Sequence, residues 1–297
     1  MYEKILVPLD GSELAETVVP YVGALAARMN SEITLLHVCS PNEAHYYHVN
    51  QIYLDKLAES LRSELLTSRE KTIDIITMVG SGSSAEEISG YAESNAINLI
   101  AMSTHGRAGV GKWVLGSVAD KLVKSSRTPI LLVRSEVPER IPAESWPTKG
   151  ILVPLDGSEF GETALPYVEE LAKTLDKEVV LLQVVTTEFR FVADMSGGGV
   201  FLTGQDIKAW TSNAEAYLNK VVARLKDKGI SSQILVMVGG PADRVVECVK
   251  EYDVDLVVMS THGHSGIARW ILGSVAQRVL EGVGTPLMLV RPSSSSR

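Results

Sequence analysis

The sequence predicts an α/β protein of two tandem five-stranded parallel-sheet domains with helices on both faces. Short runs that are apolar at every position alternate with longer segments whose apolar residues recur at helical spacing. Strands that are apolar on both faces and separated by helices indicate a parallel sheet between two helical layers. The whole pattern occurs twice, since KILVPLDGSELAETVVPYVGALA from Lys4 is repeated as GILVPLDGSEFGETALPYVEELA from Gly150.

Each half is expected to alternate five strands with four helices. In the first half we expect strands at 4–9, 31–38, 72–79, 98–103 and 129–133, and helices at 13–29, 52–66, 85–94 and 113–123. Pro20 and Pro166 fall inside the first helix of each half, where a proline costs about 3 kcal/mol or bends the axis, which argues against an unbroken helix there. Gly116 and Ser117 fall inside the last expected helix of the first half.

The repeat also predicts the domain boundaries. A second pair of segments, STHGRAGVGKWVLGSVADKLV and STHGHSGIARWILGSVAQRVL, follows the first, and the halves end in TPILLVR and TPLMLVR. Between them, SEVPERIPAESWPTK carries three prolines and mixed charge without apolar periodicity, which is typical of a linker. We therefore expect a first domain over 1–135, a linker over 136–149, a second domain over 150–292 and a disordered tail over 293–297.

The second half is longer between its second strand and its second helix. The extra segment, TTEFRFVADMSGGGVFLTGQD, contains three consecutive glycines. Because long loops without secondary structure are often functional, we expect a mobile loop or a lid over 186–205.

Composition excludes several classes of function. The 297 residues include 28 Lys plus Arg against 36 Asp plus Glu, a net charge of −8, and no basic cluster stands out, which argues against binding to nucleic acid or an anionic membrane. No run reaches the roughly 18 apolar residues of a membrane span, and the first residues do not resemble a signal peptide, so we expect a cytoplasmic location. Cys39 and Cys248 lack the spacing of a disulfide framework or a zinc site and are expected to be small buried residues.

Two repeated loops are expected to meet at one end of each sheet. Ligands of an open parallel sheet bind beyond the carboxyl ends of its strands, where the strand order changes direction. The loop PLDGS follows the first strand at Pro8–Ser12 and Pro154–Ser158. The second loop follows the fourth strand and begins at Ser103 or Ser260.

Asp10 and Asp156 each precede a Gly-Ser pair at the start of a helix. One interpretation is structural, with turn chemistry at the aspartates and N-caps at Ser12 and Ser158. The other is that a carboxylate at this end of the sheet accepts hydrogen bonds from hydroxyl or amino groups of a ligand. The residues alone allow both interpretations.

The histidines do not indicate a metal or a catalytic site. His105 and His262 each precede a glycine and have no second histidine at ligand spacing, so a capping or hydrogen-bonding role is expected rather than zinc binding. His37 aligns with Gln183, so an imidazole at that position belongs to one half only. The sequence has neither a Gly-x-Ser-x-Gly nucleophile elbow nor paired carboxylates that recur outside helical faces. Binding is favoured over turnover, and no catalytic residue, metal or redox cofactor is expected.

The stretch THGRAGVGKW nearly matches a Walker A phosphate loop through Gly106, Gly111 and Lys112, but Trp113 stands where the hydroxyl for Mg²⁺ belongs. The second half has ARW in place of GKW, so the Gly-Lys pair is not repeated. Both halves share Ser-Thr-His-Gly, nine residues and Gly-Ser-Val. This pattern offers backbone N–H groups, glycines without a Cβ and a serine hydroxyl, which suit phosphate oxygens. The alternative is that these glycines only shape a tight connection.

These motifs resemble the universal stress protein family. Its nucleotide-binding members share a glycine, two residues, a glycine, nine residues, and a glycine followed by serine or threonine. Both halves match every position except the first, which is serine. The likeness covers both halves nearly from end to end, including ILVPLDGS and the closing TPILLVR. It implies a tandem member of the family, whose domains are Rossmann-like and of the adenine-nucleotide alpha-hydrolase type.

The resemblance implies an adenine-nucleotide site in each half. The aspartate after the first strand and the residue that ends the second strand would hold adenine and ribose, and the glycine-rich loop and the Gly-Ser pair would hold the phosphates. The implied residues of the first half are Pro8, Leu9, Asp10, Val38, Met102, Ser103, His105, Gly106, Arg107, Gly116, Ser117 and Val118. Those of the second half are Pro154, Leu155, Asp156, Val184, Met259, Ser260, His262, Gly263, Gly273, Ser274 and Val275.

Three functions follow as hypotheses. The leading one is a cytoplasmic stress-response protein that binds ATP or AMP, with or without Mg²⁺, in one or both halves and hydrolyses it slowly or not at all. The alternative, motivated by Ser103 and Ser260 in place of the family glycine, is a protein that binds no nucleotide and acts through protein partners and oligomerisation. The third is an ATP-consuming enzyme, which rests on the Walker-like stretch and on the extra loop, and predicts that Lys112→Ala abolishes turnover.

The resemblance also has implications for assembly. Family members commonly pair through the last strand of each domain. A fusion of two copies therefore implies that PILLVR and PLMLVR meet within one chain as a pseudo-twofold dimer, which protects two apolar edges. We also expect whole chains to form a homo-dimer.

Overall fold

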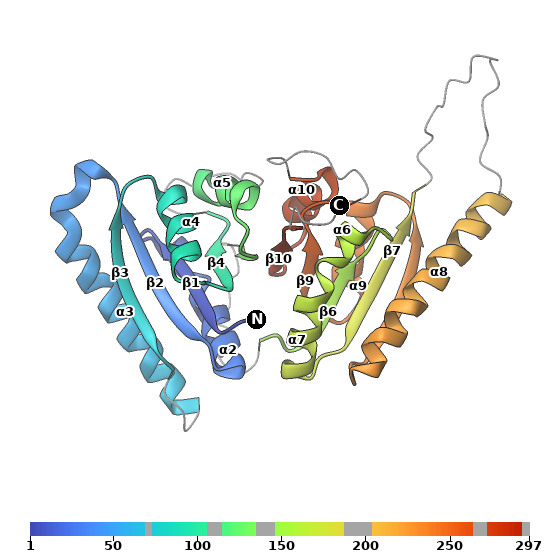
Figure 1. The fold of residues 1–297 in the computed structure, drawn as a ribbon, viewed down its shortest axis with the longest axis horizontal. Helices are drawn as coiled ribbons and strands as arrows, with labels where there is room; N and C mark the ends of the chain where they lie inside the picture. Colours follow the sequence, from blue (N-terminus) through green and yellow to red (C-terminus); the bar gives the residue numbers. More distant parts are fainter. Residues whose placement is uncertain (69–72, 106–114, 135–145, 187–203, 264–271, 293–297) are drawn as a thin grey trace, which may run out of the picture.

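The computed structural model describes residues 1–68, 73–105, 115–134, 146–186, 204–263 and 272–292. Its strands form one ten-stranded sheet in the order β3-β2-β1-β4-β5-β10-β9-β6-β7-β8. Neighbouring strands run parallel within each half, whereas β5 and β10 pair antiparallel where the halves meet. Figure 1 shows the two halves side by side with helices on both faces of the sheet. The predicted α/β fold class is confirmed.

The described elements follow the predicted alternation. The first half contains β1 (Lys4–Leu9), α1 (Glu13–Glu16), α2 (Val19–Met29), β2 (Glu32–Cys39), η1 (Pro41–Tyr46), α3 (Tyr47–Ser68), β3 (Ile75–Ser81), α4 (Ser84–Ser94), β4 (Leu99–Ser103), α5 (Ser117–Ser125) and β5 (Ile130–Val133). The second half contains β6 (Gly150–Pro154), α6 (Glu159–Glu162), α7 (Leu165–Leu175), β7 (Val179–Val185), α8 (Gly204–Asp227), β8 (Ser232–Val238), α9 (Pro241–Glu251), β9 (Val254–Ser260), α10 (Ser274–Gly282) and β10 (Leu287–Val290).

The first helix of each half is interrupted, as the prolines predict. α1 ends at Glu16 and α2 begins at Val19, so Pro20 lies in the first turn of the new helix, where its missing N–H costs no hydrogen bond. Pro166 lies in the first turn of α7 in the same way.

The expected last helix of the first half is wrong in one respect. Gly116 lies outside the helix as its N-cap, with an extended ψ of 149°, and Ser117 is the first residue of α5. The apolar pattern misled because Leu115 and Val118 both pack against the same core layer although only Val118 is helical. The second half has the same geometry, with Gly273 as the N-cap of α10.

Some sequence predictions lie wholly or partly outside the described residues. The tail over 293–297, most of the loop over 186–205, and the linker up to residue 145 belong to this group. At the end of that loop, Gly204 and Gln205 already belong to α8. At the end of the linker, Trp146 is buried and its indole N–H donates to the Asp255 carbonyl at 3.2 Å.

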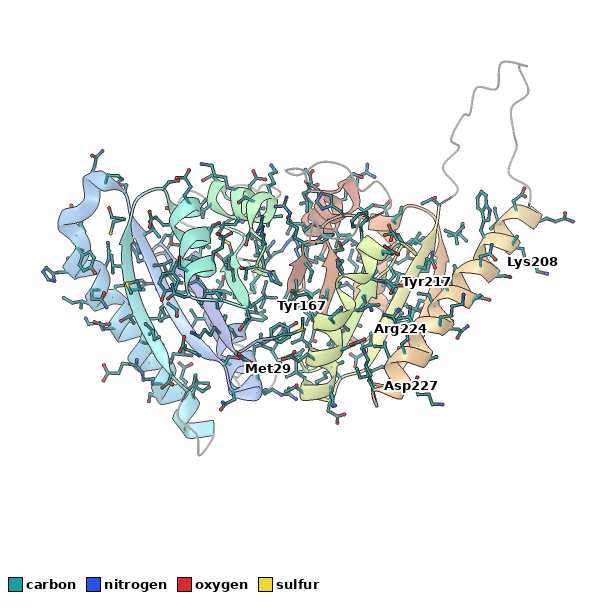
Figure 2. The ribbon with its side chains drawn as sticks, in the orientation of Figure 1. Met29, Tyr167, Lys208, Tyr217, Arg224 and Asp227 are labelled. Carbon is teal, nitrogen blue, oxygen red and sulfur yellow. The ribbon has the colours of Figure 1, made fainter. Side chains whose placement is uncertain are left out.

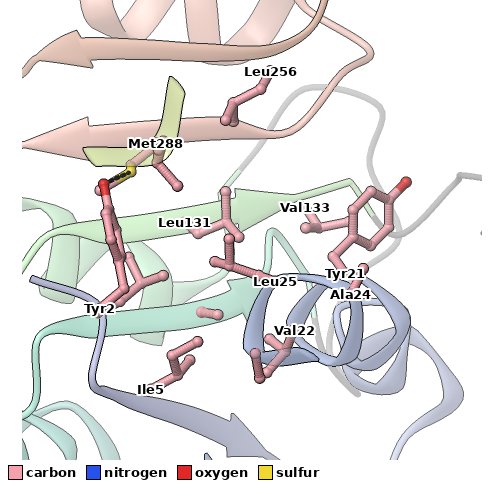
Figure 3. Packing of buried hydrophobic residues seen from close by; sticks show 14 of the residues in the cluster. Tyr2, Ile5, Tyr21, Val22, Ala24, Leu25, Leu131, Val133, Leu256 and Met288 are labelled. Carbon is pink, nitrogen blue, oxygen red and sulfur yellow. Dashed lines mark hydrogen bonds between the residues drawn. The ribbon is translucent and has the colours of Figure 1, made fainter. Parts of the chain in front are cut away.

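The core consists of two apolar layers, one on each face of the sheet. One layer packs under α2, α3, α7 and α8, and the other under α4, α5, α9 and α10, and each includes residues of both halves. Figure 3 shows the first layer where the halves meet, with Tyr2 reaching from the N-terminal segment to Met288 on β10. The Tyr2 hydroxyl lies 3.7 Å from the Met288 sulfur. Apolar side chains of both halves are therefore buried together at the junction.

Side-chain contacts also cross the junction. The Arg28 guanidinium at the end of α2 donates to the Leu175 carbonyl at 2.8 Å, and the Tyr21 ring packs edge-on against Trp146 at 5.0 Å between centroids. In the central pair of strands, Leu131 lies opposite Met288. None of the described helices is both long enough and apolar enough to cross a lipid bilayer.

Candidate functional site

In each half two neighbouring strands stop pairing before their carboxyl ends, and the position between these ends is here named the crevice. β1 pairs with β2 and with β4, but it pairs with β4 only at Ile5 and Leu6, and the two strands then diverge. Pro8 lies in the diverging part of β1, where its missing N–H is tolerated. In the second half, β6 and β9 pair only as far as Leu152. The strand order reverses between these strands, so the crevice is the switch point at which open α/β sheets bind ligands.

The aspartate loop directly follows the first strand of each half and so begins at the crevice. In the first half, Asp10 Oδ1 accepts from the Ser12 backbone N–H at 3.0 Å and from the Ser12 hydroxyl at 2.6 Å. The Ser12 hydroxyl in turn accepts from the Ala15 N–H and caps α1. Asp156 and Ser158 repeat this arrangement, again at 3.0 and 2.6 Å. The structural role of these residues is present in both halves, and it occupies one of the two carboxylate oxygens.

The loop after the fourth strand meets the aspartate loop in the second half. A Cβ added to Gly263 would lie 2.1 Å from Asp156 Oδ2 and 3.1 Å from its Cγ. No side chain fits into that separation, so the backbone of the Ser-Thr-His-Gly loop passes directly beside the carboxylate. The matching glycine of the first half, Gly106, lies outside the described residues, as does Arg107.

A threonine links the same loop to the helix that follows. Thr104 donates its N–H to the Val133 carbonyl at 2.8 Å, and its own carbonyl accepts the Gly116 N–H at 2.9 Å. In the second half, Thr261 donates to Val290 at 2.8 Å and accepts from Gly273 at 3.0 Å. The start of α5 or α10 is thereby held against the end of β4 or β9.

The glycine N-caps leave the helix starts open. Gly116 and Gly273 contribute no side chain, and no side-chain hydrogen bond caps either helix in the described part of the chain. Ser117 and Ser274, the first helical residues, are exposed. A Cβ at Gly273 would lie 2.9 Å from the Thr261 carbonyl, so glycine is required by close packing there. Open N–H groups and the helix dipole together favour an anion at these two points.

The serines at the first motif position form hydrogen bonds within their own loop. Ser103 and Ser260 are both buried. The Ser103 hydroxyl donates to the His105 carbonyl at 2.5 Å, whereas the Ser260 hydroxyl accepts from the His262 N–H at 3.3 Å. The Ser260 hydroxyl also accepts from Thr163 at 3.4 Å, which ties this loop to the end of α6.

The histidines are oriented by their neighbours. Nδ1 of His105 lies 3.0 Å from the Thr104 hydroxyl, and Nδ1 of His262 lies 2.9 Å from the Thr261 hydroxyl. Nε2 of His262 is buried and has no hydrogen-bond partner among the described residues. A buried polar nitrogen in this position is available to a ligand or a water molecule.

The apolar residues of the predicted site separate onto two faces of the sheet. One group belongs to or packs against the layer under α4, α5, α9 and α10: Val38, Met102, Val118, Val184, Met259 and Val275. Leu9 and Leu155 instead point into the opposite layer and are only 4% exposed. The structure therefore does not place these two leucine side chains in the crevice.

A tyrosine of each half contacts the short helix that follows the aspartate loop, and the sequence motifs did not predict this contact. The Tyr53 hydroxyl on α3 donates to Glu16 at 2.8 Å, and the Tyr217 hydroxyl on α8 donates to Glu162 at 3.1 Å. Tyr217 is labelled in Figure 2. Burial, the Glu162 carboxylate and the nearby charge of Asp156 raise the pKa of Tyr217 above its ordinary value. The Glu-Thr pair that occurs at the same place in both halves is the only part of this contact that the sequence repeat displayed.

A concave surface lies away from the crevice. A groove of about 430 Å³ between α9 and α10 is lined by Asp243, Val246, Arg278 and Glu281. In the parts of the chain that the structure describes, no group of three His, Cys, Asp or Glu side chains is arranged to hold a metal ion.

Comparison with known proteins gives a consistent result. The model of the universal stress protein family matches residues 1–134 and 147–291. Universal stress protein MJ0531 of Methanocaldococcus jannaschii is 32% identical over 143 residues, which cover 48% of this chain and 82% of that protein. Universal stress protein Rv2005c of Mycobacterium tuberculosis is 25% identical over 316 residues and is matched over 97% of both chains.

A solved structure shows the same fold over the whole length. The crystal structure of a universal stress protein from Archaeoglobus fulgidus superposes with a TM-score of 0.70 at 18% identity, and the match covers 99% of this chain and 97% of that one. The tandem arrangement of two halves is therefore found in a chain of low sequence identity.

Proposed function

Because the chain belongs to the universal stress protein family, we propose that it is a stress-response protein that binds ATP or another adenine nucleotide at the carboxyl end of the sheet in one or both halves. The observation that carries the proposal is the close passage of Gly263 beside the Asp156 carboxylate, next to the open start of α10. An acceptor for hydroxyl or amino groups and a set of donors for an anion thus lie at one crevice. A nucleotide has both kinds of group.

The residues present fit such a ligand. The open N–H groups at Ser274 and Val275, with their glycine N-cap, suit the phosphate oxygens. Asp156 supplies a carboxylate beside Gly263, and carboxylate oxygens accept hydrogen bonds from hydroxyl and amino groups such as those of ribose and adenine. Met259 and Val184 offer apolar surface to the base. The first half carries the same residue types, with Gly106 and Arg107 as the predicted phosphate contacts.

We assign no catalytic residue, and hydrolysis is proposed to be slow or absent. A Mg²⁺ ion that arrives with ATP would be bound through the phosphate oxygens. A cytoplasmic location is part of the same proposal and is tested by cell fractionation.

Calorimetry of nucleotide-stripped protein tests the binding. We expect heat of binding with ATP and AMP. If no heat appears at millimolar ligand while circular dichroism shows an intact fold, the proposal is wrong. Mass spectrometry of a denatured sample adds an independent test, because a nucleotide that co-purifies with the protein is released and identified.

A pair of variants separates this site from a Walker-type site. Gly116→Asp places a negative charge at the start of α5, where it repels phosphate. An added Cβ there would lie 3.2 Å from the Thr104 carbonyl, so circular dichroism of the variant must show an intact fold. We expect this variant to abolish binding in the first half. Lys112→Ala is expected to leave binding unchanged. The reverse result would favour the ATP-consuming enzyme.

The second candidate function is a protein that binds no nucleotide and acts through protein partners. It is favoured by the Ser103 hydroxyl, which donates to the His105 carbonyl of its own loop. Release of a co-purified nucleotide would exclude this candidate.

We also propose that the two halves act as an intramolecular pseudo-dimer and that whole chains form a homo-dimer. The antiparallel pairing of β5 with β10 supports the first part. Light scattering tests the second, with an expected mass of twice that of one chain.

A further inference from the structure

Two arginines at equivalent positions exchange contacts between the halves. Arg134 follows β5, and its guanidinium donates to the Glu281 carbonyl at the end of α10. Arg291 follows β10 and donates to the Lys124 carbonyl at the end of α5, at 2.6 Å. Each half thus supplies a cation to the carboxyl end of the other half's helix, where a positive charge is stabilising. Figure 1 shows α5 and α10 on either side of the junction.

Each of these arginines is also joined to the candidate site of its own half. Arg134 directly follows Val133, whose carbonyl accepts the Thr104 N–H at 2.8 Å. Arg291 directly follows Val290, whose carbonyl accepts the Thr261 N–H at 2.8 Å. Burial lowers the pKa of the Arg291 guanidinium, as does the nearby charge of Arg127.

Together these contacts close a ring through both candidate sites. Starting from α5, the ring passes from its N-cap Gly116 through Thr104 and Val133 to Arg134, and so to the far end of α10. It then passes along α10 to Gly273, through Thr261 and Val290 to Arg291, and back to the far end of α5. The two helices whose open starts lie at the candidate sites are each anchored by the opposite half.

We infer that this ring couples the two candidate sites in a crossed manner, so that order at one site stabilises the helix that forms the other. This inference rests on the proposed function for the identity of the ligand, but the crossed anchoring of the helices does not. A nucleotide that orders the loop at Thr261 would fix Val290 and Arg291, and through them α5. Because the ring runs in both directions, the coupling is reciprocal.

Hydrogen exchange of the whole chain tests the anchoring without a ligand. In Arg291→Ala we expect amide exchange in α5 to rise about fivefold, with α10 unchanged, because the helix loses a cation at its carboxyl end. In Arg134→Ala we expect the rise in α10 and not in α5. Arg291→Lys and Arg134→Lys keep the charge and are expected to show a smaller rise in the same helix. If an alanine variant fails to fold, the lysine variant provides the test.

Arg28→Ala is the matched control. Arg28 also donates across the junction to a carbonyl at the end of a helix, Leu175 of α7, and within the described residues its bonds go to the Leu175 and Pro147 carbonyls and not to a candidate site loop. We expect no change in α5 or α10. A similar rise in all three variants, or no crossed rise in the two ring variants, would overturn the inference.

Calorimetry with ATP then tests the coupling. In the unmodified protein we expect the second nucleotide to bind about fivefold more tightly than independent sites allow, and in Arg134→Ala/Arg291→Ala we expect two independent sites. Independent sites in the unmodified protein would overturn the coupling. If hydrogen exchange shows the crossed pattern but neither the unmodified protein nor the variants bind nucleotide, the crossed anchoring is supported and the proposed function is wrong.

Discussion

Gly263 shows how one missing Cβ defines the candidate site of the second half. Its backbone lies so close to Asp156 that an alanine Cβ would fall 2.1 Å from Oδ2. Gly263→Ala must therefore push the loop or the carboxylate out of place, and we expect at least tenfold weaker nucleotide binding in the second half, equivalent to about 1.4 kcal/mol. The measurement is calorimetry against ATP.

Gly284→Ala is the control for that variant. It lies in the same half, and an added Cβ there would meet no atom within 4 Å. Its affinity for ATP is expected to match that of the unmodified protein. Equal weakening in both variants, or none in Gly263→Ala, would contradict the assignment of Gly263 to the site.

Tyr21 makes stability depend on pH at the alkaline end. Burial and the nearby Asp255 charge raise the pKa of Tyr21 to about 12, against about 10 for an unfolded tyrosine. The protonated form is favoured in the folded state, so this contribution is complete below about pH 10 and is lost as the pH rises through about 12. We expect a shallower alkaline loss of stability in Tyr21→Phe, which retains the ring contact with Trp146.

Urea unfolding at pH 8, 10 and 11 measures this effect. Burial also raises the pKa of Tyr2, which remains in the variant. The alkaline loss of stability is therefore expected to decrease but not to vanish. An identical pH dependence in both proteins would show that Tyr21 makes no such contribution.

At the scale of elements, the long helices hold the short helices that follow the aspartate loops. Tyr217 on α8 donates to Glu162 at the end of α6, and Arg224 on the same helix donates to the other oxygen at 2.6 Å. Both residues are labelled in Figure 2. We expect Tyr217→Phe to lower the free energy of unfolding by about 1 kcal/mol, because one hydrogen bond to a carboxylate is lost while Arg224 is kept.

Tyr53→Phe tests the same element contact in the first half, where the hydroxyl donates to Glu16 at 2.8 Å. Chemical denaturation measures both variants, and we expect a loss of similar size. A loss confined to one half would show that only one long helix supports its neighbour.

Local signals explain why most elements were predictable. Apolar runs located β1 at its observed bounds, and the prolines located the interruptions at α2 and α7. The start of α5 was missed because Leu115 continues the apolar periodicity without helical backbone. A glycine N-cap has no side chain by which the sequence could predict it, whereas Ser12 and Ser158 predicted the starts of α1 and α6.

At the scale of the whole molecule, the shared core layers predict cooperative unfolding. Each layer contains residues of both halves, and the sheet is continuous through β5 and β10. We therefore expect one calorimetric transition, with equal van't Hoff and calorimetric enthalpies, although the chain is longer than most two-state proteins. Two separate transitions would contradict this prediction.

Two core variants sharpen this test. Leu131→Ala lies at the junction and Leu54→Ala lies in α3, far from it, and both side chains are buried. Each variant is expected to lower the free energy of unfolding by about 2–5 kcal/mol. The single transition is expected to move to a lower temperature without splitting. A shoulder in Leu54→Ala alone would show that the first half unfolds independently.

By itself the sequence determined the alternation of strands and helices, the duplication, and the aspartate and Ser-Thr-His-Gly loops as candidate site segments, because periodicity, turn residues and repeats are local properties of the chain. Only the tertiary structure decided which loops touch. The passage of Gly263 beside Asp156, the layers shared by both halves and the exchanged arginines depend on residues far apart in sequence; Arg134 and Glu281 are separated by 147 positions, and Arg291 and Lys124 by 167. Such contacts arise when the folded sheet brings strand ends together, and no local pattern specifies them.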